Sequence, residues 1–140
     1  NKNKDIYEGN KLEYSDYKIA MINSDFDIKY MVDRDKLHRS IIEMGLCSSY
    51  EPTIYPGVNM KYYYNTNNSN GICCCNSICD GKGNADGDGN CKRVTIAIFN
   101  SGKIIITGGN DIKQLKTCHK FISNKLKDRK KYEMNDYEIK

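Results

Sequence analysis

Apolar and polar residues alternate along several stretches of the chain and recur with helical spacing along two others. Alternation with a period of two from Lys18 to Val32 predicts a first strand. Asp33 can then cap a helix that Gly45 would end by adopting a left-handed conformation. The apolar positions of this helix are Leu37, Ile41 and Met44, spaced i, i+4 and i+7.

The second half of the chain predicts more strands and a second helix. Residues 47–64 have strand character that is interrupted at Glu51-Pro52 and again at Pro56-Gly57, which indicates two strands joined by an exposed loop. Residues 93–99 and 103–107 alternate around Asn100-Ser101-Gly102 and predict a hairpin. Asn110 is expected to cap the second helix. Its apolar face consists of Ile112, Leu115, Cys118 or His119, Ile122 and Leu126.

This order of elements predicts an α+β fold with a five-stranded antiparallel sheet and two helices on one face. The expected divisions are a polar tail over residues 1–16, a folded unit over residues 17–127 and a basic C-terminal tail over residues 128–140. A cysteine-rich insertion over residues 65–92 interrupts the folded unit between the third and fourth strands.

The two hairpin strands present two different faces. We assign one face to the core under the helices: Val94, Ile96, Ile98, Ile104 and Ile106. The other face is small, apolar and uncharged: Thr95, Ala97, Phe99, Ile105 and Thr107. A bare apolar face indicates either a binding partner or burial against another domain, and spacing alone does not separate these two.

Composition narrows the class of protein. A chain of 140 residues with 39% hydrophobic residues is long enough for one small core. The formal net charge of +4 permits an anionic partner without requiring one. No apolar run approaches the ~20 residues that span a bilayer, so we expect no membrane contact. The chain shows no Ser/His/Asp set, phosphate-binding loop or paired carboxylates, so we do not expect an enzyme.

Five of the seven cysteines lie in the insertion. The thiolates of Cys73, Cys75, Cys79 and Cys91 could bind one structural zinc ion, which would order a loop that has no core of its own. Cys74 competes with its neighbours for a ligand position. Free thiols and a disulfide remain alternatives. The stretch from Asn84 to Gly89 begins like a calcium-binding loop, but its twelfth position would be Thr95 instead of glutamate, which excludes that interpretation.

Two ordered motifs carry a resemblance to a known family. The run from Ser48 to Val58 resembles the stirrup segment in the C-terminal repeat of TATA-box-binding proteins. The run from Ile98 to Gly108 resembles the strand–turn–strand signature of that repeat, and residues 18–30 fit its opening strand. With its cysteine-rich insertion, the chain is most similar to the TATA-binding-like proteins of large DNA viruses.

The resemblance implies a curved sheet with helices on its convex face and DNA on its concave face. It implies a transcription initiation factor that binds and bends A·T-rich DNA through the minor groove. Tyr55 and Phe99 would be wedges inserted between bases, and Lys61 and Lys103 would contact phosphate. The other residues that it implies at the DNA are Val58, Thr95, Ala97, Ile105, Thr107 and, displaced from the family position, Asn23.

The resemblance also implies protein partners. Glu51, Thr53 and Ile54 of the stirrup segment would contact a transcription factor IIB-like protein within the RNA polymerase machinery. The polar tail is too short to encode a second repeat, so we expect either an upstream repeat or a homodimer that pairs the strands at residues 18–30. The expected location is inside the infected cell, in a viral factory, the nucleus or the cytoplasm, or packaged in the virion. The alternative function is a non-enzymatic module that binds viral transcription or virion proteins through the same fold and the zinc loop.

Overall fold

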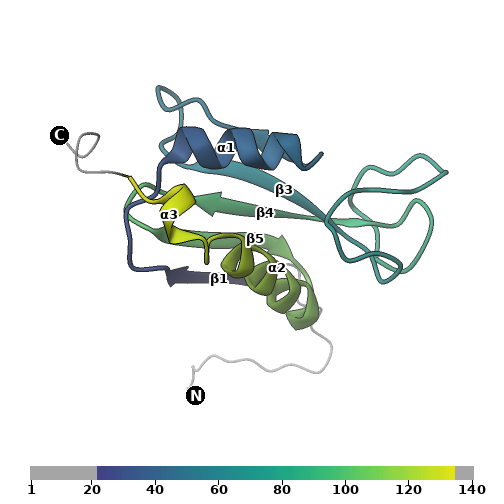
Figure 1. Ribbon diagram of the computed structural model, residues 1–140. Coiled ribbons are helices and arrows are strands. Elements are labelled where there is room, and N and C mark those ends of the chain that lie inside the picture. Colours follow the sequence, from purple (N-terminus) through teal and green to yellow (C-terminus); the bar gives the residue numbers. More distant parts are fainter. Residues whose placement is uncertain (1–21, 135–140) are drawn as a thin grey trace, which may run out of the picture.

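The computed structural model describes residues 22–134, which form two layers (Figure 1). The elements are β1 (Ile22–Asp27), α1 (Arg34–Glu43), β2 (Cys47–Ser49), β3 (Val58–Tyr64), β4 (Lys92–Ile98), β5 (Lys103–Gly109), α2 (Ile112–Lys125) and α3 (Arg129–Tyr132). The five strands form one sheet in the order β1-β5-β4-β3-β2, and each neighbouring pair is antiparallel. The predicted α+β architecture is confirmed.

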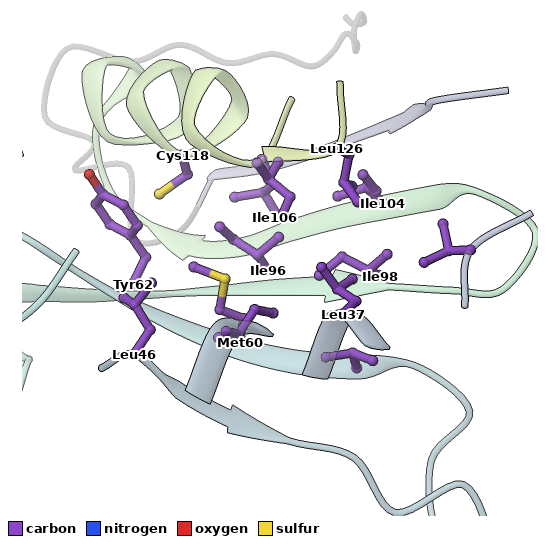
Figure 2. Packing of buried hydrophobic residues seen from close by; sticks show 14 of the residues in the cluster. Leu37, Leu46, Met60, Tyr62, Ile96, Ile98, Ile104, Ile106, Cys118 and Leu126 are labelled. Atoms are coloured by element: carbon purple, nitrogen blue, oxygen red, sulfur yellow. The ribbon is translucent and has the colours of Figure 1, made fainter. Parts of the chain in front are cut away.

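The core lies between the two long helices and one face of the sheet (Figure 2). The five residues assigned to this layer from the sequence are fully buried: Val94, Ile96, Ile98, Ile104 and Ile106. The helices contribute Leu37 and Ile41 from α1 and Leu115, Cys118 and Ile122 from α2. Burial of each large aliphatic side chain contributes about 1.5–3 kcal/mol. The opposite side of the sheet is called the open face here, and it alternates with the core positions along every strand.

Both long helices begin at a capping aspartate. The Asp33 side chain accepts a hydrogen bond from the Lys36 amide at 3.1 Å, as expected for the N-cap of α1. The cap of α2 is Asp111 and not Asn110, and its side chain accepts from the Lys113 amide at 2.7 Å. Asn110 is used differently, because its side chain accepts from the amide group of Gln114 at 2.8 Å. This bond satisfies the buried Gln114 and leaves Asp111 as the cap.

Strand β1 is shorter than its apolar alternation predicts. It ends at Asp27, whose side chain accepts a hydrogen bond from the Lys29 amide at 2.7 Å. Lys29 has a positive φ of 69°, so the chain turns here towards α1 instead of continuing to Val32. The expected start of the strand at residues 18–21 and the polar tail over residues 1–16 lie outside the described residues.

The basic C-terminal tail begins later than expected. Residues 129–132 form α3, and Tyr132 is 2% exposed. The Tyr132 hydroxyl lies 2.8 Å from Ser40 Oγ of α1, and its backbone oxygen accepts from the Asp33 amide at 2.7 Å. Basic neighbours conceal this anchor in the sequence, because Arg129, Lys130 and Lys131 are exposed around the one buried ring. The expectation of a tail from residue 128 is therefore wrong for residues 128–134.

The insertion extends beyond the ends of β3 and β4 (Figure 1). It contains no helix or strand within residues 66–91, as its lack of periodicity predicts. Its final part folds back beside the start of β4, where the Arg93 amide donates to Gly81 O at 2.7 Å and the Gly83 amide to Cys91 O at 3.1 Å. None of the described helices is long and apolar enough to cross a membrane.

Candidate nucleic-acid interface and metal site

Strand register brings the expected DNA-contacting residues together on the open face. Thr95 of β4 pairs with Thr107 of β5, and Ala97 pairs with Ile105. Because directly opposed residues of an antiparallel pair point to the same side, these four side chains form one continuous block. The block is uncharged and only partly exposed. It can therefore contact a shallow apolar surface without desolvating a charge.

Tyr55 and Phe99 meet at one end of this block. Their ring centroids lie 5.7 Å apart at an interplanar angle of 56°. Gly57 is buried beneath them, and a Cβ atom there would lie 3.0 Å from Phe99 Cε1 and 3.1 Å from Tyr55 Cε2. Glycine at this position therefore gives the two rings the space to lie together. Tyr55 is 39% exposed, so the pair presents an aromatic edge to solvent.

The stirrup segment (residues 48–58) is supported by α1. The Arg34 guanidinium donates a hydrogen bond to Pro56 O and lies 5.3 Å from the centre of the Tyr50 ring. Within the segment, Glu51 O accepts from the amides of Ile54 and Tyr55 at 2.8 and 2.9 Å. These contacts hold the backbone while leaving the expected partner-binding side chains in solvent: Glu51, Thr53 and Ile54. Ile54 is 82% exposed.

Lys61 lies across the sheet and does not extend away from it. Its Nζ donates a hydrogen bond to Thr95 Oγ1 at 2.8 Å. Partial burial lowers the pKa of Lys61, and the nearby Arg93 charge lowers it further. The expected phosphate contact therefore comes from an ammonium group that already has a neutral partner on the open face.

The second expected phosphate-binding residue, Lys103, faces an acidic neighbour. Its Nζ lies 3.7 Å from Asp25 Oδ2, and both side chains are more than half exposed. Asp25 pairs with Ile105, which places the carboxylate on the open face. Asn23 is exposed in the irregular stretch of pairing between Ile22 and Ser24, and alternation along β1 puts it on the same side as Asp25. An acidic residue at this edge was not foreseen from the sequence.

Val58 does not lie where the resemblance implied. It is fully buried in the core opposite Ile98, so its side chain is not on the open face. Its neighbour Asn59 takes the open-face position, because it pairs with Ala97. The one-residue difference follows from the period of two along β3, in which Met60 and Tyr62 share the buried side with Val58. Asn59 was missed because the segment matched as a motif before its strand register was assigned.

The structure gathers the four expected metal ligands in the insertion. The Sγ atoms of Cys73, Cys75, Cys79 and Cys91 all lie within 4.8 Å of one another. Cys91 is buried immediately before β4, and the other three come from the preceding loop. Cys74, which competed for a ligand position in the sequence, is exposed and outside this cluster. The arrangement is suited to a metal ion held by four sulfur ligands.

Polar contacts around the cluster fix its position at the end of the sheet. Asn65, the residue after β3, donates to Gly87 O at 2.7 Å and lies 3.5 Å from Cys91 Sγ. The Sγ atoms of Cys75 and Cys91 are 3.5 Å apart. Burial raises the pKa of the Cys91 thiol to about 12, so it is protonated at neutral pH unless a cation displaces the proton.

Comparison with known proteins agrees with the fold. The family model described as transcription factor TFIID (or TATA-binding protein, TBP) matches residues 16–129. A TATA-box-binding protein-like protein of Acanthamoeba polyphaga mimivirus is 33% identical over 133 residues, covering 86% of this chain and 29% of that protein. The chain thus spans less than a third of the length of this relative.

Proposed function

Because the chain belongs to the TATA-binding protein family, we propose that it is a transcription initiation factor that binds and bends A·T-rich promoter DNA through the minor groove. The family gives the general role, which is transcription through a non-enzymatic DNA-binding fold. The proposal for this chain is carried by one observation, the Tyr55–Phe99 pair at the end of the uncharged block of Thr95, Ala97, Ile105 and Thr107.

The block has the properties that the minor groove of A·T-rich DNA requires. That groove presents acceptors with almost no donors, and its floor is shallow, so small side chains such as threonine and alanine can approach it closely. Aromatic side chains at the edge of such a surface can enter a base step and kink the duplex, at a cost of a few kcal/mol per unstacked step. Pyrimidine–purine steps within A·T-rich DNA lower that cost.

Binding to matched duplexes tests this proposal. We expect the 140-residue chain to bind an A·T-rich duplex more tightly than a G·C-rich duplex of equal length, with affinity decreasing as salt increases. Equal affinity for the two duplexes at every salt concentration would contradict minor-groove recognition and favour the protein-binding alternative.

We also propose that the stirrup segment binds a transcription factor IIB-like protein within the RNA polymerase machinery. Glu51, Thr53 and Ile54 are exposed together on a backbone that Arg34 holds in place. An isoleucine exposed as fully as Ile54 offers apolar area that a partner can bury. Pull-down of such a partner should be weakened by Ile54→Ser and unaffected by Ile112→Ser, which changes an exposed isoleucine on α2.

The metal of the cysteine cluster is proposed to be zinc with a structural role. Zinc–sulfur bonds of ~2.3 Å in a tetrahedron place sulfur atoms about 3.8 Å apart. The observed upper limit of 4.8 Å allows this geometry after a small contraction. Protein purified without chelator should contain about one zinc ion per chain. Absence of zinc together with seven freely titratable thiols would contradict the site.

The exposed edge of β1 supports an assembly proposal. β1 is at the end of the strand order, so one of its edges has no partner strand among residues 22–134. We propose that this edge pairs with a second repeat upstream or with β1 of a second copy. Sedimentation of the 140-residue chain at micromolar concentration should show a dimer or aggregation. A stable monomer would contradict pairing through this edge.

The protein-binding alternative has one observation in its favour. Ile78 is 98% exposed in the insertion, next to Ser77, whose amide and hydroxyl contact the Asp88 carboxylate. An exposed apolar side chain on a braced loop is suited to binding a protein partner. In this version, the chain would bind a viral transcription or virion protein. Either function would place the chain in the infected cell, in a viral factory, the nucleus or the cytoplasm, or within the virion.

A further inference from the structure

Asn59 brings an amide group to the middle of the open face. It lies on β3 between Ser49 of β2 and Ala97 of β4, to which it is directly opposed. Its side chain is half-buried, so its polar atoms remain accessible to a ligand on this face. An amide offers both a donor and an acceptor, unlike the apolar side chains that suit a pure A·T floor.

The surface is lowest beside Asn59. Ala97 stands between Asn59 and Ile105 in the same row across the sheet. It is only 5% exposed and yet lies outside the core cluster, which means that its short side chain is covered from the open side by larger neighbours. A group that projects from the floor of the groove could therefore occupy the space above the Ala97 methyl group.

The neighbouring row leaves Asn59 as the available acceptor. Lys61 Nζ donates to Thr95 Oγ1 at 2.8 Å, which uses a lone pair of that hydroxyl. The hydroxyl hydrogen of Thr95 can still be donated to a base acceptor. The Asn59 Oδ1 atom, however, can accept a hydrogen bond from a base.

Guanine supplies the one donor in the minor groove. Its N2 amino group projects from the groove floor beside its N3 acceptor, whereas A·T pairs present only acceptors. An amide can accept from N2 and donate to N3 of the same guanine. We infer that Asn59 recognises the N2 amino group of guanine above Ala97, so the DNA element bound by this chain contains a G·C pair at that position within an A·T-rich sequence. This inference rests on the proposed minor-groove binding.

Inosine separates the amino group from all other features of the base pair. An A·T-rich duplex is varied at one position at a time to G·C or inosine·C, which lacks only the N2 amino group in the minor groove. At one position the 140-residue chain should bind G·C about three- to tenfold more tightly than inosine·C, the range expected for a hydrogen bond. Asn59→Leu should abolish this preference, while Asn124→Leu, on the exposed side of α2, should retain it.

The outcomes distinguish this inference from the proposal beneath it. Inosine·C bound as tightly as G·C, or more tightly, at every position would overturn the inference and leave A·T-rich minor-groove binding intact. A G·C preference that persists in Asn59→Leu would also overturn it, because another group would then read the base. Failure of the wild-type chain to bind any duplex would contradict the proposed function itself.

Discussion

Tyr55 and Phe99 come from different connections of the chain, and yet their rings lie 5.7 Å apart over the buried Gly57. Tyr55 belongs to the stirrup segment between β2 and β3, and Phe99 directly follows β4. Pairing of Val58 with Ile98 brings these two connections to the same end of the sheet. Two aromatic side chains therefore occupy one point at the edge of the open face, where a single base step could receive both.

The first prediction concerns the hydroxyl group of Tyr55. Tyr55→Phe should increase the affinity for A·T-rich DNA by about three- to tenfold, because insertion of a phenol between bases removes its hydroxyl from water and burying an unpaired hydroxyl costs about 1–3 kcal/mol. Titration of a labelled duplex measures this change. Unchanged affinity would indicate that the Tyr55 ring stays outside the base stack.

The second prediction concerns the acidic edge of the open face. Asp25→Asn should increase DNA affinity and steepen its salt dependence by about one phosphate contact, because Lys103 would lose its carboxylate neighbour and become available to phosphate. Glu43→Gln removes an acid from the exposed side of α1 and provides a control with the same change in charge. If both variants gain equal affinity, the effect comes from net charge and not from Lys103.

The third prediction concerns the metal-binding loop. Cys91→Ser should abolish zinc binding and make residues 65–91 susceptible to proteolysis, because this loop lacks a hydrophobic core and a metal ion would tie it to β4. Chelation of the wild-type protein should have the same effect. Cys74→Ser should retain the metal, since Cys74 lies outside the cluster. Equal metal content in both variants would contradict the proposed ligand set.

The fourth prediction tests whether α3 belongs to the folded unit. Tyr132→Ala should lower the free energy of unfolding by about 3 kcal/mol, as expected for loss of a buried aromatic ring. Replacement of the neighbouring exposed Lys130 by alanine should change it by less than about 0.5 kcal/mol. Chemical denaturation measures both values. Equal stability of the two variants would mean that residues 128–134 do not support the fold.

Local physical rules made part of this structure predictable from sequence. The period of two in the hairpin identified the buried isoleucines of β4 and β5, and Asp33 identified the start of α1. The cysteine cluster could also be predicted, because four thiols crowded into a loop without apolar residues have few other roles. These features depend on neighbours in the sequence.

Features that depend on distant contacts were missed. The position of Asn59 follows from the register of β3 against β4, which a motif match does not contain. The ion pair of Asp25 with Lys103 joins two strands far apart in the chain. Tyr132 is buried because it reaches Ser40 of α1, although its neighbours in the sequence are basic and exposed.

The most direct test of the account is the bend that the chain introduces into DNA. Fluorescence transfer between dyes at the two ends of an A·T-rich duplex should increase when the wild-type chain binds. Phe99→Ala should bind the same duplex with a much smaller increase, because the wedge acts after docking. Saturating binding of the wild-type chain without any change in transfer, or an equal change with Phe99→Ala, would contradict minor-groove bending by the Tyr55–Phe99 pair.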